Sequence, residues 1–288
     1  MNKTTDTLVR DIYDLVSSKE IPEGVDLDAA IESFGENIKR LCRNEFQSAR
    51  RDNRTLRMSN IGRSDRYLWH VQKGTEGETI LPHTLIKFLY GHVIEELLLF
   101  LTKASGHTVT DEQKLCEVNG IKGHMDCKID GVVTDVKSAS SFAFKKFKDG
   151  TLAENDSFGY IDQIKGYAHA EGTREVGWLA MDKQNGHLTY LKYDLDYPQY
   201  PSLEGDITDR IDHIKAVVLE EDIPPVCAKP EPDGKSGNMK LPTQCSYCQF
   251  KKACYPNLRT FLYSTGPRHL VKVVKEPNVI ELGGDDGF

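Results

Sequence analysis

The dipeptide Asp130-Gly131 lies between two segments in which apolar and polar residues alternate, and it constrains the fold more than any other feature. Asp-Gly favours the two-residue turn of a β-hairpin, because both residues tolerate the positive φ angles of that turn. A hairpin with this turn places Asp126 directly opposite Asp135. The sequence therefore predicts two carboxylates that face each other across a pair of strands.

Alternation along this hairpin predicts one apolar face and one charged face. The apolar face holds Met125, Cys127, Ile129, Val132, Thr134 and Val136, and the charged face holds His124 opposite Lys137 and Asp126 opposite Asp135. Like charges with Cβ atoms ~5 Å apart destabilise a strand pair unless a cation lies between them. Carboxylates and the backbone carbonyl of Val136 are oxygen ligands that suit Mg²⁺. The alternative is a surface hairpin whose charges face water.

A long helix is predicted from Pro82 to Ala104, with proline in its first turn and Gly106 just after its end. On this helix Glu95 shares a stripe with apolar neighbours, whereas Glu96 is expected to point toward solvent. We expect Glu95 to add a third carboxylate to the pair on the hairpin. The alternative is a residue at the rim of the helix that reaches water.

The other predicted elements give a mixed α/β fold. Strands are expected at residues 107–118, 121–129, 132–138, 176–181 and 188–193, helices within 1–58 and at 160–170 and 203–221, and a loop at 224–241. We expect three consecutive parts: a helical N-terminal extension (1–58), a core (59–222), and a cysteine-containing segment with a loose C-terminal tail (223–288).

Composition limits the functional classes. Of 288 residues, 39% are hydrophobic and 28% charged, with a mean hydropathy of -0.49, which is typical of a folded soluble protein. No apolar run reaches the ~20 residues of a membrane helix. The N-terminal residues lack an apolar signal-peptide core, so we expect a cytoplasmic protein with reduced thiols. Because the net charge is -7, a nucleic-acid partner requires a local basic surface or bound cations.

One such basic stretch runs from Lys39 to Lys73. It contains ten basic residues (Lys39, Arg40, Arg43, Arg50, Arg51, Arg54, Arg57, Arg63, Arg66 and Lys73) against three acidic ones (Glu45, Asp52 and Asp65). One interpretation is a solvated helix face, and the other is a surface for DNA phosphates. A second basic group, Lys145, Lys146 and Lys148, is either a set of phosphate contacts or a solvated loop.

Four short motifs occur in order along the chain. They are Gly91-x-x-x-Glu95, Gly123-His-Met-Asp126, Asp135-Val-Lys137 and Gln163-x-x-x-Tyr167. Together they resemble the motifs of PD-(D/E)xK nucleases, in the branch of RecB-like and lambda-exonuclease-like enzymes that includes CRISPR-associated exonucleases and phage-encoded relatives. The resemblance covers residues 59–256 and implies a restriction-endonuclease-like core, a mixed sheet flanked by helices.

The resemblance also implies roles for these residues. Glu95, Asp126, Asp135 and the Val136 carbonyl are implied to hold one or two Mg²⁺ or Mn²⁺ ions, Lys137 to orient or activate the attacking water, and Gln163 and Tyr167 to contact the scissile strand. Many RecB-like members have histidine where this chain has Glu95, whereas lambda-type members have glutamate. The chemistry agrees, since a bound divalent ion supplies hydroxide at neutral pH and stabilises the charged transition state. On spacing alone, Gln163 and Tyr167 are also compatible with a surface pair on a helix.

Three cysteines near the C-terminus, Cys245, Cys248 and Cys254, have a spacing that lets thiolates converge on a metal or cluster. This pattern is similar to that of RecB-like nucleases with an iron-sulfur cluster, which take a fourth cysteine from just before the core. Here residues 59–70 contain no cysteine, so the candidates for a fourth ligand are Cys227, Cys42 and His70. Both [4Fe-4S] and Zn²⁺ stay open, in a structural role. Cys116 and Cys127 are expected in the core.

The sequence therefore predicts a Mg²⁺- or Mn²⁺-dependent deoxyribonuclease, an exonuclease acting on DNA ends in phage replication, recombination or breakdown of host DNA. Its expected partners are DNA and a phage replication or recombination protein. A structure-specific endonuclease is the first alternative. The second is a DNA-binding module that keeps the fold and the cysteine-bound metal without cleaving, although Asp126, Asp135 and Lys137 are all present.

Overall fold

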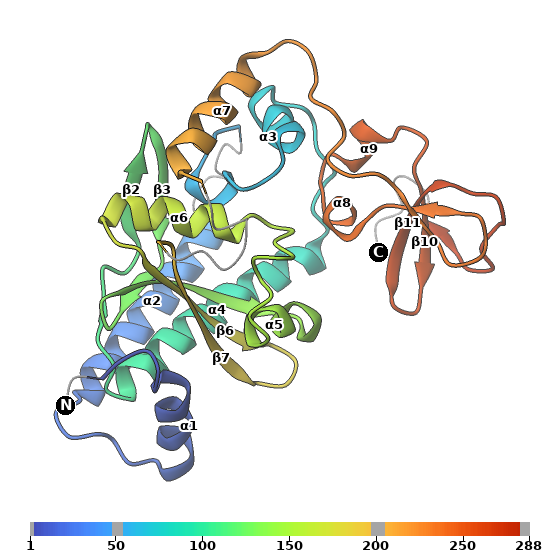
Figure 1. Cartoon of the computed structure of the whole chain (residues 1–288). Coiled ribbons are helices and arrows are strands. Elements are labelled where there is room, and N and C mark those ends of the chain that lie inside the picture. The colour runs from blue at the N-terminus through green and yellow to red at the C-terminus, as the bar shows by residue number, and fades with distance from the viewer. Residues whose placement is uncertain (1–2, 48–53, 197–204, 283–288) are drawn as a thin grey trace. The chain divides into compact units, whose positions relative to one another are not determined.

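The computed structural model describes residues 3–47, 54–196 and 205–282 (Figure 1). Contacts divide the chain into two compact units that interleave in sequence. The first contains the described residues of Met1–Asp52, Arg57–Gly62 and Leu85–Asp212, and the second those of Asn53–Leu56, Arg63–Thr84 and His213–Phe288. The division into three consecutive parts at 1–58, 59–222 and 223–288 stays a prediction. Three residues of the basic stretch, Arg50, Arg51 and Asp52, and the predicted tail at 283–288 lie outside the described residues.

A five-stranded mixed sheet forms the centre of the first unit. Its strands lie in the order β1 (Val109–Thr110), β4 (Cys127–Ile129), β5 (Val132–Ala139), β6 (Glu175–Asp182) and β7 (Leu188–Asp194). Strands β5 and β6 are parallel, and the other neighbours are antiparallel. A separate antiparallel hairpin pairs β2 (Lys114–Val118) with β3 (Ile121–Met125). The predicted mixed α/β class is confirmed.

The helical elements of the first unit pack around this sheet. They are α1 (Leu8–Ser18), α2 (Leu27–Gln47), η1 (Met58–Asn60), α5 (Ser141–Lys148), α6 (Tyr160–Glu171) and the greater part of α4 (Pro82–Ala104), with α7 (Ile207–Leu219) beginning in this unit. Helix α4 begins and ends where the sequence predicts, and Gly106 follows with φ +85°. No helix among the described residues is long and apolar enough to span a membrane.

The hydrophobic core forms where the apolar face of the β4–β5 hairpin meets α4 and α1. The buried residues of this core are Leu8, Ile12, Ile94, Leu98, Leu99, Cys127, Ile129, Val136 and Leu179. Cys127 is fully buried there, as predicted, and Cys116 on β2 is buried as well. The alternation of the hairpin therefore determines which side of the sheet receives the long helix.

The β4–β5 hairpin has the predicted turn and register, but it is shorter than predicted. Asp130 and Gly131 have φ angles of +50° and +85°, and Cys127 pairs with Thr134. At Asp126 the ladder ends, because the carboxylate of Asp126 accepts a hydrogen bond from the Val136 amide at 2.8 Å. The strand that ends just before Asp126 is β3, which belongs to the β2–β3 hairpin.

Two expectations about these strands were consequently wrong. His124 on β3 lies opposite Leu115 on β2, not opposite Lys137. The segment predicted as one strand at residues 107–118 is divided into β1 and β2. Both differences follow from the break at Asp126, which separates the β2–β3 hairpin from the main sheet.

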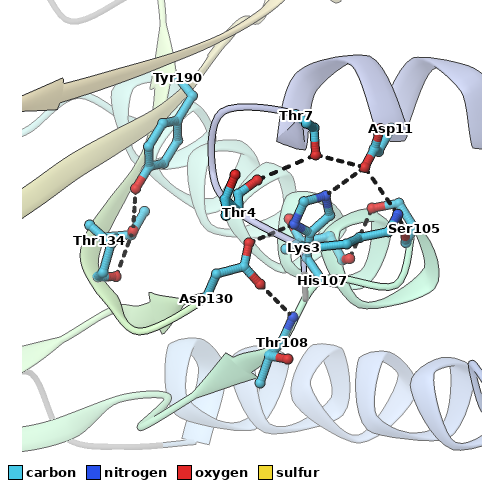
Figure 2. A network of polar contacts seen from close by, with 12 residues as sticks. Lys3, Thr4, Thr7, Asp11, Ser105, His107, Thr108, Asp130, Thr134 and Tyr190 are labelled. Carbon is cyan, nitrogen blue, oxygen red and sulfur yellow. Dashed lines mark hydrogen bonds and ion pairs between the residues drawn. The ribbon is translucent and has the colours of Figure 1, made fainter. Parts of the chain in front are cut away.

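A buried polar cluster connects the N-terminal helix α1 with the turn of the β4–β5 hairpin. Figure 2 shows the His107 ring between two carboxyl groups, with Nδ1 2.7 Å from Asp130 and Nε2 3.3 Å from Asp11 on α1. Lys3 contacts both Asp11, at 3.0 Å, and the carbonyl of Ser105. The His107 side chain has no solvent exposure. The cluster therefore links α1 and the end of α4 to the hairpin that carries Asp126 and Asp135.

Replacing His107 by glutamine is expected to lower the free energy of unfolding by about 3 kcal/mol, because the two carboxyl groups then lose the ring that lies between them. Urea denaturation of the purified protein measures this change. His187→Gln, at an exposed position, is the matched control and should stay within about 0.5 kcal/mol of wild type. Equal stabilities for the two variants would contradict a stabilising role of the cluster.

The second unit contains a small sheet that the sequence analysis did not predict. Its elements are α3 (Asp65–Gln72), β8 (Glu231–Pro232), β9 (Met239–Lys240), α8 (Thr243–Ser246), α9 (Lys251–Cys254), β10 (Arg259–Tyr263), β11 (Gly266–Lys272) and β12 (Glu281–Leu282). The strands form an antiparallel sheet in the order β12-β10-β11-β9-β8. The predicted loop at 224–241 therefore contributes two short strands, and residues 259–282 contribute three more. Phe261 and Leu270 are buried in this sheet.

Candidate active site and cysteine cluster

Asp126 and Asp135 lie next to each other on the side of β5 that faces α6. Asp135 is only 2% exposed, and the negative charge of Asp126 acts on its carboxyl group. Burial raises the pKa of both groups, and nearby negative charge adds to this effect, since Glu95 acts on Asp126 and Asp126 acts on Asp135. The alternative of a surface hairpin whose charges face water is therefore wrong, and the two carboxyl groups are neighbours although Asp126 is outside the strand ladder.

Protein donors satisfy part of this pair. Lys137 Nζ donates to Oδ1 of Asp135 at 2.7 Å, and the Val136 amide bonds Asp126. Apart from its 2.7 Å ion pair with Lys137, the buried Oδ2 of Asp135 has no hydrogen-bond partner among the described residues. A buried carboxylate oxygen that only a lysine ammonium reaches keeps a lone pair for a metal ion.

Lys137 lies between the acidic pair and an aromatic ring. Burial lowers the pKa of Lys137, but Asp135 and Asp126 outweigh this and raise its pKa above the ordinary value. Its Nζ lies 5.0 Å from the centre of the Tyr160 ring, close enough for a cation-π contact. Sequence reasoning missed Tyr160, although its spacing from Gln163 and Tyr167 places all three on one face of α6.

Gln163 and Tyr167 have different positions from those expected. Gln163 Nε2 donates to Oδ1 of Asp135 at 3.2 Å. Tyr167 is 2% exposed and hydrogen-bonds to Gln163, so it does not reach the surface. Its hydroxyl lies below Gly123, where an added Cβ would approach it to 2.9 Å and Met58 Cβ to 2.5 Å. Gly123 thus leaves room for the tyrosine, which supports Gln163 from within the core.

Glu95 approaches the pair from α4. After burial, its negative charge is the next largest cause of the raised pKa of Asp126. Oε1 of Glu95 accepts a hydrogen bond from Gln113 Nε2 at 3.3 Å, and Oε2 lies 3.8 Å from Nδ1 of His92. The expectation for Glu96 was wrong, because Asn37 on α2 covers it and donates to its carboxylate at 2.8 Å.

These residues suit a divalent ion by their chemistry, but no cage is preformed. Among the described residues, no three Asp, Glu, His or Cys side chains converge closely enough to hold a metal ion. Lys137, Gln163 and the Val136 amide bind the acidic pair, and Gln113 binds Glu95. The atoms of Glu95, Asp126 and Asp135 that could bind a metal ion are all oxygens, which Mg²⁺ and Mn²⁺ prefer. The side chains therefore fit such an ion if Glu95 turns from Gln113 toward the pair.

The C-terminal cysteines gather in the second unit. Burial and then the nearby thiols of Cys227, Cys248 and Cys254 raise the pKa of Cys245 to about 12. Since each of these three thiols acts on Cys245, their sulfur atoms lie near the sulfur atom of Cys245. Cys42 lies on α2 in the first unit.

Several donors surround these thiols. Arg66 Nε donates to Cys254 Sγ at 3.1 Å, Ser64 Oγ to Cys227 Sγ at 2.7 Å, and the Phe250 amide to Cys248 Sγ at 3.4 Å. His70, a candidate for the fourth ligand, has Nε2 4.0 Å from Cys254 Sγ. Hydrogen bonds of this kind stabilise thiolates, the form that binds metal. As with the carboxylates, the described thiols do not form a closed metal site.

The basic groups divide between elements. Lys145, Lys146 and Lys148 lie on helix α5 and not on a loop. In the Lys39–Lys73 stretch, Lys39 belongs to α2 in the first unit and forms an ion pair with Glu36, whereas Arg66 belongs to the second unit. Hence the described part of this stretch is not one helix face.

Comparisons with known proteins give only distant structural similarities. No protein-family model and no curated protein matches the chain. The crystal structure of SSO0001 aligns with 76% of this chain and 95% of its own, at 13% identity and a TM-score of 0.41. LHK-Exo in complex with dAMP aligns with 58% of this chain and 91% of its own, at 12% identity and a TM-score of 0.37. LHK-Exo, an alkaline exonuclease from Laribacter hongkongensis, gives the same coverages at 13% identity and a TM-score of 0.35. These values do not assign the chain to a family.

Proposed function

We propose that this protein is a Mg²⁺- or Mn²⁺-dependent deoxyribonuclease of the PD-(D/E)xK type that degrades DNA from its ends. The observation that carries the proposal is the buried pair of Asp126 and Asp135 in contact with Lys137. Burying two like charges is costly, and strongly shifted carboxyl groups that contact one another are typical of sites that bind ions or move protons. A purely structural role would be served better by apolar side chains of similar volume.

Each residue of the site has a chemical task in this proposal. Glu95, Asp126, Asp135 and the Val136 carbonyl would hold the divalent ion, which supplies a nucleophilic hydroxide and stabilises negative charge on the phosphate. Lys137 orients the attacking water or neutralises charge on the phosphate oxygens. Gln163 holds the Asp135 carboxylate in place, and Tyr167 in turn holds Gln163.

The four cysteines Cys227, Cys245, Cys248 and Cys254 are proposed to hold a structural [4Fe-4S] cluster or Zn²⁺. Their mutual proximity supports this, and Cys227 is the fourth ligand that their grouping favours. The motif resemblance supports a phage-encoded enzyme that acts in the host cytoplasm in replication, recombination or breakdown of host DNA. A phage protein of replication or recombination is then a further partner.

Linear DNA is expected to be degraded to short products in the presence of Mn²⁺, whereas covalently closed circles of the same sequence survive, because an exonuclease requires an end. Incubation of end-labelled linear DNA and closed circles with purified protein, with and without Mn²⁺, measures this. Equal cleavage of circles would replace the proposal by a structure-specific endonuclease. If the protein binds DNA but cleaves neither form, the result would support the alternative of a non-catalytic DNA-binding module.

A further inference from the structure

Helix α5 begins directly after the strand that carries Asp135 and Lys137. Strand β5 ends at Ala139, and Ser140 caps the helix by accepting a hydrogen bond from the Ala143 amide at 3.3 Å. The helix is thereby held close to the carboxyl end of β5. Only three residues separate Lys137 from the first residue of α5, Ser141.

The two faces of α5 have opposite characters. Phe144 and Phe147 are buried and fix the orientation of the helix against the unit. On the outer side, Phe142 is 73% exposed, and Lys145 and Lys148 are exposed beside it. Lys146 bonds the Asn155 carbonyl at 2.7 Å, and its Nζ lies 5.8 Å from the centre of the Phe142 ring. We call Phe142, Lys145, Lys146 and Lys148 the α5 surface.

A second exposed aromatic residue lies toward the same end of β5. Gly91 of α4 faces Ser138 of β5, since an added Cβ would approach the serine Oγ to 3.1 Å. Glu95, one turn further along α4, is near Asp126, so α4 runs antiparallel to β5. Phe88 precedes Gly91 on α4 by three residues. In this antiparallel arrangement Phe88 lies beyond Ser138, toward the carboxyl end of β5, and its side chain is 54% exposed.

We propose that the α5 surface binds a single DNA strand that leads into the active site, with a base stacked on Phe142 and phosphates in contact with Lys145 and Lys148. This rests on the proposed nuclease function and adds a substrate class to it. Exposed aromatic rings next to cations are typical of surfaces for single strands, because every unpaired base offers a flat face for stacking. Duplex DNA keeps those faces covered, so Phe142 discriminates between the two forms. The three lysines complement the phosphates, although the whole chain carries a net charge of -7.

Phe142→Ala tests the stacking contact, and Leu219→Ala, at a 79% exposed apolar position at the end of α7, is the control. The measurement is the fluorescence anisotropy of labelled oligo(dT) and of a blunt duplex in EDTA, where no cleavage occurs. Phe142→Ala should weaken binding of oligo(dT) about tenfold and change duplex binding little, whereas Leu219→Ala should bind both like wild type. The double variant Lys145→Glu, Lys148→Glu should weaken both and reduce the salt dependence of binding.

Binding of oligo(dT) by Phe142→Ala within about twofold of wild type would overturn the proposal, as would an equal loss in Leu219→Ala. The proposal would also be overturned if the wild type does not bind oligo(dT). Because these measurements need no catalysis, they are independent of the nuclease proposal, which fails on its own if no DNA is cleaved with Mn²⁺. Thermal melting of each variant verifies that the exposed substitutions leave the fold intact.

Discussion

Replacing Asp126 by asparagine is expected to abolish DNA cleavage and yet leave the protein, without added metal, at least as stable as the wild type. Cleavage is lost because the variant lacks one of the carboxylates proposed to hold the ion. Stability is retained because asparagine keeps the size of the side chain and can still accept the hydrogen bond of the Val136 amide. Removing one of two opposed charges should add about 1 kcal/mol to the free energy of unfolding near neutral pH.

The pH dependence of stability gives this prediction a definite sign. In the folded protein, burial first and then neighbouring carboxylates raise the pKa of Asp126 and Asp135, whereas an unfolded aspartate titrates near about 3.9. The folded state thus holds protons that the unfolded state has released. The contribution of this pair to stability therefore falls as the pH rises from about 4 toward neutral. We expect the variant and the wild type to converge in acid and to separate as the pH rises, with the variant more stable.

Urea denaturation at several pH values and a cleavage assay with end-labelled DNA measure both parts. Asp222→Asn, at an exposed position of the second unit, is the control and should keep wild-type cleavage and stability. An Asp126→Asn protein that is clearly less stable than the wild type at neutral pH would identify Asp126 as an ordinary structural carboxylate. If the variant still cleaves DNA, Asp126 is not one of the residues required for catalysis.

Cys245→Ser and Cys254→Ser are expected to lose the bound metal and to unfold at much lower temperature. A structural metal site contributes its binding free energy to folding, and for structural Zn²⁺ this reaches about 10 kcal/mol in small domains. Elemental analysis and the visible absorbance of the purified protein identify the metal. A brown protein indicates iron-sulfur, and a colourless protein with one equivalent of zinc indicates Zn²⁺.

Comparison of Cys227→Ser with Cys42→Ser identifies the fourth ligand. Cys227 lies among the C-terminal thiols, and we expect its loss to reduce the metal content as the loss of Cys245 does. Cys42→Ser, an exposed position on α2, should keep both the metal and the melting temperature. Full-length protein without iron or zinc, together with unchanged stability in all four variants, would show that the cysteines hold no structural metal.

The parts of the fold that were predicted correctly depend on local chemistry. The turn at Asp130-Gly131 and the register beyond it follow from φ preferences and from the alternation of side chains. The bounds of α4 follow from Pro82, the apolar stripe and Gly106. Such features are determined by neighbours in sequence, so a single sequence contains enough information to place them.

The errors concern contacts between distant segments. The charged face of β5 is covered because α6, which follows much later in the chain, brings Gln163 against Asp135. Tyr167 is inside the core because Gly123 leaves a space for it. The small sheet of the second unit was missed because several of its strands have two residues, and Pro267 interrupts the strand signal of β11. Periodicity within one segment does not report such packing.

The central claim is that the buried acidic pair binds a divalent ion, and calorimetric titration of Mn²⁺ into the full-length protein tests it most directly. We predict that the wild type binds Mn²⁺ and that Asp126→Asn binds it more than about tenfold more weakly, while Asp222→Asn binds it like the wild type. Equal affinities for the wild type and Asp126→Asn, or no binding of Mn²⁺ to the wild type, would contradict the account.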